Sequence, residues 1–299
     1  MCCIFLKLEM KKLLLGIGLL GCLASCGGKV NTDTAQMQQD VIDSVELVVD
    51  SLLVEEVVEE PIVPVAVDES FADFLYHFAL DEKMQRKRLV YPLPYYTDNR
   101  KDSIEKEEWI FDPMFSQEES YSMLYDELED ADLEKDTAAT SVRVEWIYLK
   151  TDKIKRYYFE RIKGLWTLEA IDDASIPQEE LTQEDFYEFY ERFATDSVFQ
   201  AERVVDPLAF VAPDPEDEFQ ILESTLEKGQ WFAFQPKLPN EYLTNINYGQ
   251  RLDRNSQNRV IELRGFGNGF CNLLHFRCRN GDALPISLLN STPFMLTGM

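Results

Sequence analysis

Histidine and cysteine are scarce in this chain of 299 residues, which holds 2 histidines and 6 cysteines. His77 and His275 stand in no Cys/His cluster with zinc-site spacing, so no metal site is expected. The chain also lacks a GxSxG or HExxH motif, a P-loop and a dinucleotide fingerprint. "GFGNGF" at 265–270 lacks the helix and lysine of a phosphate loop and predicts a turn between strands. We therefore expect no cofactor.

Positive charge is in deficit, because 29 Lys+Arg face 55 Asp+Glu and give a formal net charge of -26 at pH 7. Such a chain would repel phosphates, which argues against a nucleic-acid partner. One interpretation of the acidity is a surface kept soluble, and the other is a cationic partner. The 45% of hydrophobic residues is enough for a packed core.

The apolar run near the N-terminus is too short to span a membrane and is typical of an export signal. Lys11 and Lys12 precede "LLLGIGLLGCLAS", and the motif "LASC" ends at Cys26. This motif resembles the bacterial lipobox, which implies cleavage before Cys26 and acylation, including palmitate, of that cysteine. Residues 1–25 are then a lipoprotein signal peptide with its true start at Met10. An ordinary cleaved signal is the alternative.

Acyl chains on Cys26 would anchor the protein to a membrane without a spanning segment. We expect the cell envelope, and within it the outer membrane, because no Asp follows Cys26 directly to suggest retention at the inner one. The periplasmic face and the cell surface both stay open. Of the other cysteines, Cys271 and Cys278 remain after cleavage. They are expected to be small buried hydrophobes, and a bridge would need a turn between them.

Residues 26–69 carry eleven acidic residues, one base and no aromatic residue. This composition predicts an acidic tether between the lipidated cysteine and the folded part. The competing interpretation is a helix over 41–60 that packs on a partner or on the body.

A repeat begins after the tether, since "FADFLYHFALDEKMQRKRLVYPL" from Phe71 is echoed by "FYEFYERFATDSVFQAERVVDPL" from Phe186. Ten of the 23 positions are identical at an offset of 115 residues. In both copies the apolar residues fall at i, i+3, i+4 and i+7, which predicts an amphipathic helix. Asp81 and Asp196 are expected to cap a second short helix, and Arg88 and Arg203 to lie in its last turn.

The echo continues into segments rich in β-branched and aromatic residues that turn at "KTDK", "IKG", "GFGNG" and "RNGD". Helices followed by strands predict an α+β fold with two tandem units. We place unit 1 at 70–177, a linker at 178–184 and unit 2 at 185–299. The units are expected to superpose and to pack as an internal pseudo-dimer, in which case the chain would be monomeric.

The pattern "F-x-x-F…D-x-x-F-Q-x-x-R-V-x-x-P-L" from Phe186 to Leu208, on a chain with a lipobox, resembles the Bacteroidetes lipoproteins of domain of unknown function 4348. Unit 1 departs from this pattern at Met84, where unit 2 has Phe199. The resemblance implies the cone-shaped nuclear transport factor 2-like (NTF2-like) fold, with helices on a curved antiparallel sheet. It implies no activity, since a fold does not fix a function.

Candidate site residues are few. His77 corresponds to Arg192 in the second copy, so a solvated or capping role is favoured over catalysis. Aromatic residues that line the cone mouth are candidates for ligand contact. These candidates are Tyr95, Tyr96, Trp109 and Trp231.

The sequence therefore predicts a membrane-anchored envelope lipoprotein that acts as a noncatalytic module for an unknown protein or small-molecule ligand. The alternative is a pocket enzyme of hydrolase or lyase/isomerase type on the same fold. A deep cavity with an Asp or His beside an aromatic residue favours the enzyme. Filled cores with an exposed concave sheet favour the binding module.

Overall fold

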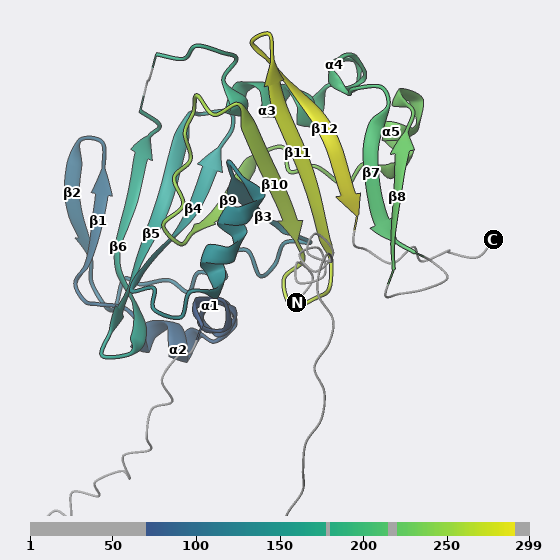
Figure 1. The fold of residues 1–299 in the computed structure, drawn as a ribbon. Helices are drawn as coiled ribbons and strands as arrows, with labels where there is room; N and C mark the ends of the chain where they lie inside the picture. The colour runs from purple at the N-terminus through teal and green to yellow at the C-terminus, as the bar shows by residue number, and fades with distance from the viewer. Residues whose placement is uncertain (1–69, 178–179, 215–219, 291–299) are drawn as a thin grey trace, which may run out of the picture. The chain divides into compact units, whose positions relative to one another are not determined.

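The computed structural model describes residues 70–177, 180–214 and 220–290, so the predicted signal peptide, Cys26 and the tether lie outside the described residues. Two helices followed by six strands recur in each half (Figure 1). The first half holds α1 (Phe71–Leu80), α2 (Glu82–Lys87), β1 (Leu93–Thr97), β2 (Arg100–Ile104), β3 (Tyr121–Tyr125), η2 (Leu128–Lys135), β4 (Ser141–Tyr148), β5 (Lys153–Ile162) and β6 (Leu165–Ser175). The second half holds α3 (Phe186–Thr195), α4 (Ser197–Arg203), β7 (Leu208–Pro213), β8 (Ile221–Leu226), η3 (Lys228–Gln230), α5 (Trp231–Phe234), β9 (Tyr242–Asn247), β10 (Asn258–Arg264), β11 (Cys271–Arg279) and β12 (Asp282–Asn290).

The two amphipathic helices form where their apolar spacing predicts them. In α1 the stripe that begins at Phe71 and Phe74 is buried, and α3 buries the stripe that begins at Phe186 and Phe189. Each such aromatic side chain contributes roughly 1.5–3 kcal/mol when it leaves water. The stripes therefore hold each helix against a hydrophobic core.

The strands form two sheets of six strands each. One has the order β2-β1-β6-β5-β4-β9, and the other has the order β3-β10-β11-β12-β7-β8. The hairpins are antiparallel as predicted, but both sheets are mixed, because β1 runs parallel to β6 and β7 runs parallel to β12. A long stretch of chain joins each first strand to its parallel neighbour, so no tight turn forces these two strands to be antiparallel.

The predicted turns connect β4 to β5, β5 to β6, β10 to β11 and β11 to β12, so those predictions are confirmed. At "IKG" and "RNGD" the turn residues Lys163, Gly164, Asn280 and Gly281 all have positive φ, as in two-residue hairpins. A register shift occurs at the same place in both halves. It lies between Tyr158 and Phe159 in the pairing of β5 with β6, and between His275 and Phe276 in the pairing of β11 with β12. Such bulges bend the strand and increase the twist of the sheet.

The two halves exchange a strand. β9 of the second half pairs with β4 in the first sheet, and β3 of the first half pairs with β10 in the second sheet. β3 and β9 contact each other where the sheets meet, at the centre of Figure 1. Neither sheet is therefore built from one half of the sequence alone.

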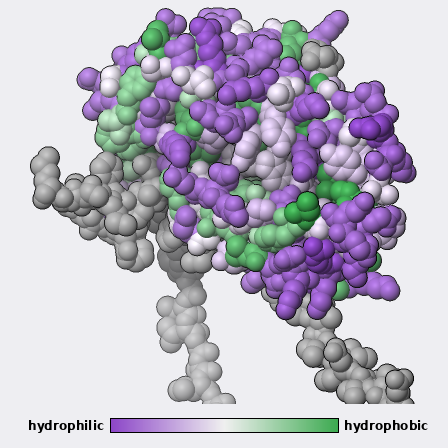
Figure 2. Space-filling model, turned by 180° about the vertical axis from the view of Figure 1, so that it is seen from behind, coloured by the Kyte–Doolittle hydropathy of each residue, from purple (hydrophilic) through white to green (hydrophobic). Residues whose placement is uncertain are grey.

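The hydrophobic cores are interlocked in the same way. The core around α1 includes Val260 and Leu273 from the second half, and the core around α3 includes Ile147 and Ile154 from the first half. All described residues belong to one compact unit. The face seen in Figure 2 is mostly hydrophilic, with small hydrophobic areas between polar side chains.

Candidate functional site

The residues expected to cap helices lie at helix ends in both halves. Asp81 Oδ1 accepts hydrogen bonds from two backbone N–H groups of α2 at 2.8 and 3.1 Å. Asp196 Oδ1 does the same for α4 at 2.9 and 3.1 Å. Arg88 and Arg203 each donate through Nη1 to a backbone carbonyl of their own half, at 3.1 and 3.2 Å. Arg203 also holds Glu184 with two bonds of 2.8 Å.

Trp109 and Trp231 lie in the two cores and have no open face for a ligand. Their side chains are 5% and 1% exposed. Each indole N–H donates at 3.0 Å to a buried glutamine, Gln85 for Trp109 and Gln200 for Trp231. Each of these tryptophans is therefore a core residue, one in each half.

The remaining polar candidates are dispersed. His77 is exposed on α1, and His275 is half-buried on β11, where burial lowers its pKa. Cys271 and Cys278 form no disulfide within the part of the chain that the structure describes, and they share strand β11. No turn separates them, so the geometry required for a bridge is missing.

Tyr95 and Tyr96 point to opposite faces of β1, as neighbouring residues of a strand do. The Lys101 ammonium lies 5.4 Å from the ring centroid of Tyr96. Tyr95 lies on the other face, against the core around α1, and its hydroxyl donates to Asp173 Oδ2 at 3.3 Å. Of the four aromatic candidates, Tyr95 alone belongs to a polar cluster at the edge of this core.

That group, the tyrosine–aspartate cluster, consists of Tyr95, Asp112, Trp146, Tyr148, Lys155, Tyr157 and Asp173. Tyr157 donates a short hydrogen bond to Asp112 Oδ2. The Tyr157 ring lies 5.0 Å from the Trp146 ring and 4.8 Å from the Lys155 ammonium. Four strands, β1, β4, β5 and β6, and the loop after β2 thus bring carboxylates, phenols and one ammonium together at one end of the first sheet.

The loop residue Asp112 is held in place by Gln85. The Asp112 backbone N–H donates to Gln85 Oε1 at 2.9 Å, and Gln85 Nε2 donates to the Asp112 carbonyl at 2.7 Å. Gln85 is fully buried. The core therefore positions the Asp112 carboxylate, which accepts the hydrogen bond from the Tyr157 hydroxyl.

Burial sets the electrostatics of the cluster. It raises the pKa of Tyr157 well above its ordinary value, and the Asp112 carboxylate adds to this effect. Burial also raises the pKa of Tyr95 and of Tyr148, in both cases with a further contribution from Asp173. The pKa of the neighbouring Tyr242 rises to about 12, first through burial and then through its hydrogen bond to Glu118. These phenols stay neutral at physiological pH and serve as hydrogen-bonding groups.

The second half does not repeat this polarity. Strand register places Phe210 where the first half has Tyr95, because each pairs with the last strand of its own half at equivalent residues, Leu288 for Phe210 and Ile171 for Tyr95. By the same register Leu274 stands for Tyr157.

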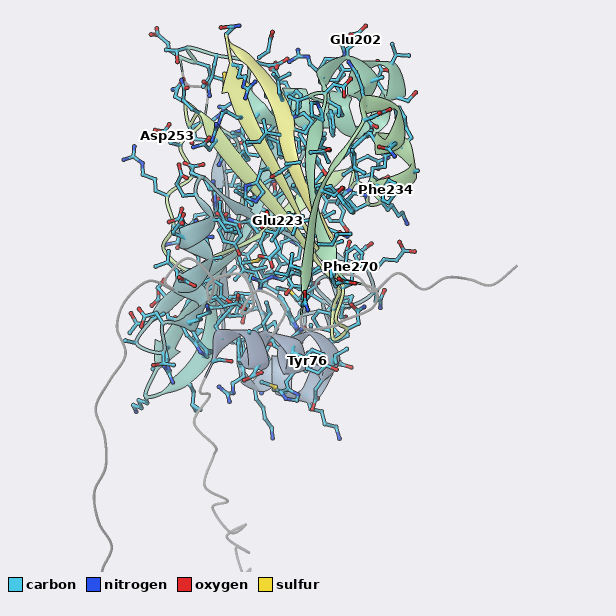
Figure 3. The ribbon with its side chains drawn as sticks, turned by 45° about the vertical axis from the view of Figure 1, so that its right-hand side comes forward. Tyr76, Glu202, Glu223, Phe234, Asp253 and Phe270 are labelled. Carbon is cyan, nitrogen blue, oxygen red and sulfur yellow. The ribbon has the colours of Figure 1, made fainter. Side chains whose placement is uncertain are left out.

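Two further equivalent positions keep the polar or apolar character of their residues but change size and charge. Leu263 stands for Trp146 and Asn272 for Lys155. The segment after Trp231 places Phe234, labelled in Figure 3, in contact with Phe210, with 5.3 Å between the ring centroids. One fold thus carries two hydrogen-bonded tyrosines, Tyr95 and Tyr157, in its first half where its second half has Phe210 and Leu274.

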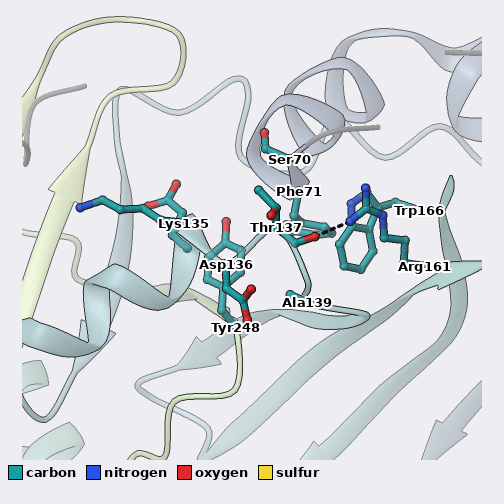
Figure 4. Close-up of a pocket in the computed structure, with 10 residues that line it drawn as sticks. Ser70, Phe71, Lys135, Asp136, Thr137, Ala139, Arg161, Trp166 and Tyr248 are labelled. Carbon is teal, nitrogen blue, oxygen red and sulfur yellow. Dashed lines mark hydrogen bonds between the residues drawn. The ribbon is translucent and has the colours of Figure 1, made fainter. Parts of the chain in front are cut away.

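A pocket of about 80 Å³ lies elsewhere, at the start of α1 (Figure 4). Phe71, Trp166, Thr137 and Tyr248 are among its lining residues, and Arg161 donates to the Thr137 carbonyl at 2.7 Å. Ligand pockets are usually about 300–1,000 Å³, so this one is too small for a typical organic substrate.

Two further properties concern only the described residues. No group of three or more His, Cys, Asp or Glu side chains in this part of the chain is arranged to hold a metal ion. Within the same part, no helix has the length and apolarity needed to cross a membrane.

Sequence inspection missed Asp112, Tyr157 and Asp173 because the stretches that contain them look like ordinary strand and loop. The signal that could have found them is the difference between the copies. At the 115-residue offset that aligns the helices, Tyr95 falls on Phe210. A polar residue aligned with an apolar one marks a position where the fold itself does not need the polar group.

Two helix-on-sheet halves with interlocked cores place the protein among NTF2-like α+β folds. It is similar to an NTF2-like protein from Bacteroides fragilis NCTC 9343, whose crystal structure matches with a TM-score of 0.73 and 48% sequence identity over 76% of this chain and 98% of that chain. Residues 49–287 match the family model described as domain of unknown function (DUF4348). The chain therefore belongs to this family, and the predicted resemblance and fold class are confirmed. No match was found among curated proteins.

Proposed function

We propose that the protein is a noncatalytic binding module, anchored to the membrane through Cys26, that takes its ligand at the tyrosine–aspartate cluster. The observation that carries this proposal is the difference between the halves. At equivalent strand positions the second half has Phe210 and Leu274 where the first has Tyr95 and Tyr157. The fold can be built without these hydroxyl groups, so their presence calls for another explanation.

The polar residues of the cluster add little to the stability of the first half. The Tyr157 hydroxyl and the Asp112 carboxylate lose water contacts when they are buried, and a hydrogen bond typically returns only about 0.5–1.5 kcal/mol net. Leu274 is fully buried in the second half and loses no polar solvation. A site for a ligand explains the less favourable choice, because functional sites are where proteins depart from the most stable packing.

Binding fits this chemistry better than catalysis. The phenols have raised pKa values, so they stay protonated at physiological pH and do not serve as general bases, and Asp112 already accepts hydrogen bonds through both carboxylate oxygens. Tyrosine rings supply contact area with few rotatable bonds, and their hydroxyl groups supply directional hydrogen bonds. The cluster is thus equipped to recognise a ligand by shape and hydrogen bonding.

Solvent mapping by NMR on residues 70–299 tests the binding site, with phenol, isopropanol, acetamide and methylamine as probes. We expect shift changes to concentrate at Tyr95, Tyr148 and Lys155. The equivalent end of the second sheet, around Phe210 and Phe234, is the internal control. Equal responses at both places, or none at the cluster, would contradict the proposal.

The anchor is tested separately. The motif "LASC" supports acylation of Cys26, so Cys26→Ala should move the full chain from the membrane fraction to the soluble fraction when it is expressed in a Gram-negative host. Cys22→Ala, inside the same signal segment, is the matched control and should stay with the membranes. A Cys26→Ala protein that still sediments with outer membranes would overturn the lipoprotein assignment.

A further inference from the structure

We infer that the group recognised by the tyrosine–aspartate cluster is a primary ammonium, of the kind carried by a lysine side chain or a simple alkylamine. This inference rests on the proposed function and narrows it to a class of ligand. It follows from the balance of donors and acceptors in the cluster, from the position of Lys155 and from the charge of the chain.

Hydrogen-bond acceptors are in excess in the cluster. Asp173 Oδ2 accepts from the Tyr95 hydroxyl, whereas Asp173 Oδ1 is buried and has no hydrogen-bond partner among the described residues. The hydroxyls of Tyr95 and Tyr157 use their protons on carboxylates, so the phenol oxygens are left with lone pairs. An ammonium carries three donors and no acceptor, which is the complement of this arrangement.

The cluster already accommodates one ammonium. Lys155 is paired directly across from Asp173 in the sheet, so the two side chains share a face, and its Nζ lies 4.8 Å from the Tyr157 ring centroid. A cation over an aromatic face is attracted by the ring quadrupole. Lys155 therefore shows the chemistry that the site favours, and it is the internal competitor that a ligand ammonium must displace.

Long-range charge acts in the same direction. The chain has a formal net charge of -26, which raises the local concentration of cations and repels anions. Because this effect is not specific to one place, the binding experiment needs salt and a neutral isostere. The isostere removes the charge and keeps the size and apolar contacts of the ligand.

Isothermal titration calorimetry of residues 70–299 with n-butylamine and with n-butanol, at about 0.15 M salt to screen surface charge, makes the comparison. A blocked Gly-Lys-Gly peptide and its norleucine isostere form a second pair. We expect each amine to bind at least about tenfold more tightly than its neutral partner, as charge-assisted hydrogen bonds imply. Tighter binding of the peptide than of butylamine assigns the ammonium to a lysine of a partner, and equal binding assigns it to a free amine.

Three variants localise the effect. Asp173→Asn should weaken amine binding about tenfold or more, and Tyr95→Phe, which copies Phe210, should weaken it by a smaller factor. Lys155→Met should strengthen it severalfold by removing the competing ammonium. Glu223→Gln on β8, the edge strand of the second sheet, removes one carboxylate outside the cluster and should change nothing.

The outcomes separate this inference from the proposed function. Amine binding that Asp173→Asn leaves unchanged would overturn the ammonium assignment. Equal affinity for butanol and butylamine would also overturn it. If Tyr95→Phe then weakened the binding of both compounds equally, the cluster would remain the binding site. If no probe binds and solvent mapping finds no response at the cluster, both conclusions fail.

Discussion

Ser122 of β3 and Thr244 of β9 hold each other's backbone through reciprocal hydrogen bonds. The Thr244 N–H donates to Ser122 Oγ at 2.8 Å, and Ser122 Oγ donates to the Thr244 carbonyl at 2.7 Å. In the other direction, the Ser122 N–H donates to Thr244 Oγ1 at 2.6 Å, and Thr244 Oγ1 donates to the Ser122 carbonyl at 2.9 Å. Both residues are buried, so this pair joins the two exchanged strands without help from water.

Removing either side chain should therefore destabilise the whole compact unit. Ser122→Ala leaves a buried N–H and a buried carbonyl of Thr244 without these partners, which costs roughly 2–4 kcal/mol in the free energy of unfolding. Thr244→Val should cost a similar amount. Because the two side chains act as one unit, the double variant should cost clearly less than the sum, measured by urea unfolding. Additive losses would mean that the pair is not coupled.

The strand exchange could not be predicted from the sequence, although the elements could. Helices and hairpins depend on neighbours along the chain, which is why the Phe71 and Phe186 stripes and the turn at Asn280 are visible as patterns. The choice of partner for β3 depends on contacts more than a hundred residues away. A strand of five residues such as Tyr121–Tyr125 carries the same alternation whichever sheet receives it.

The buried glutamines should differ in importance although they are equivalent in position. Gln85 accepts from Trp109 and the Asp112 N–H and donates to the carbonyls of Phe78 and Asp112. Gln200 accepts from Trp231 and donates to the Phe193 carbonyl. We expect Gln85→Leu to lower the free energy of unfolding by about 3 kcal/mol or more, and Gln200→Leu by about 2 kcal/mol.

Thermal and urea unfolding of both glutamine variants measures the difference. Gln85→Leu should also weaken ligand binding at the cluster, because it releases Asp112. Gln200→Leu is the matched control and should leave binding unchanged. Equal losses of stability would show that the contacts to Asp112 add nothing.

Asp81→Ala and Asp196→Ala should each cost about 1 kcal/mol of stability, the usual value for an N-cap. Their bond lengths to the helix N–H groups agree within 0.1 Å, since they are 2.8 and 3.1 Å for Asp81 and 2.9 and 3.1 Å for Asp196. Urea unfolding should therefore give nearly equal losses, and the Asn variants should recover most of the stability. Loss of an enzymatic activity without a change in stability at either Asp would favour the enzyme alternative.

His275 should make stability depend on pH in the acidic range. Burial, with a smaller contribution from Arg277, lowers its pKa below the ordinary value of 6.5. The unfolded chain then binds the proton more readily than the folded one, so the free energy of unfolding falls as pH decreases below about 6.5 toward the lowered pKa. His275→Gln should flatten this slope in urea unfolding between about pH 7 and pH 5. His77→Gln, at an exposed position, is the control.

The candidate site was less accessible to prediction than the fold. Tyr95 is a sequence candidate only as one of several aromatic residues that could line the mouth of the cone. Asp112 and Tyr157 come together only through the Gln85 contacts and the pairing of β5 with β6, and neither leaves a local pattern. The sequence alone does not distinguish Trp109 and Trp231 from aromatic residues that contact a ligand. In the structure their indole N–H groups point into the core and donate to buried glutamines.

The exchange of β3 and β9 predicts how an isolated first half should behave. Residues 70–177 lack β9, so the edge of β4 is unpaired and β3 has no sheet of its own. Because β3 occupies in the second sheet the place that β9 occupies in the first, two copies can complete each other by each placing β3 on the partner's β4. We expect this fragment to be a dimer in sedimentation velocity.

One residue adjusts the strength of that dimer. In the full chain Asn245 Nδ2 donates to the buried Glu145 at 2.9 Å, and strand register places Met123 at the equivalent position of β3. The fragment dimer would therefore leave one Glu145 oxygen without its amide donor. Met123→Asn should restore that donor and tighten the dimer about tenfold, which is the effect of one hydrogen bond to a buried charge. Leu124→Pro, which interrupts β3, should abolish the dimer, and a folded monomer of the unmodified fragment would show that the first half does not need an exchanged strand.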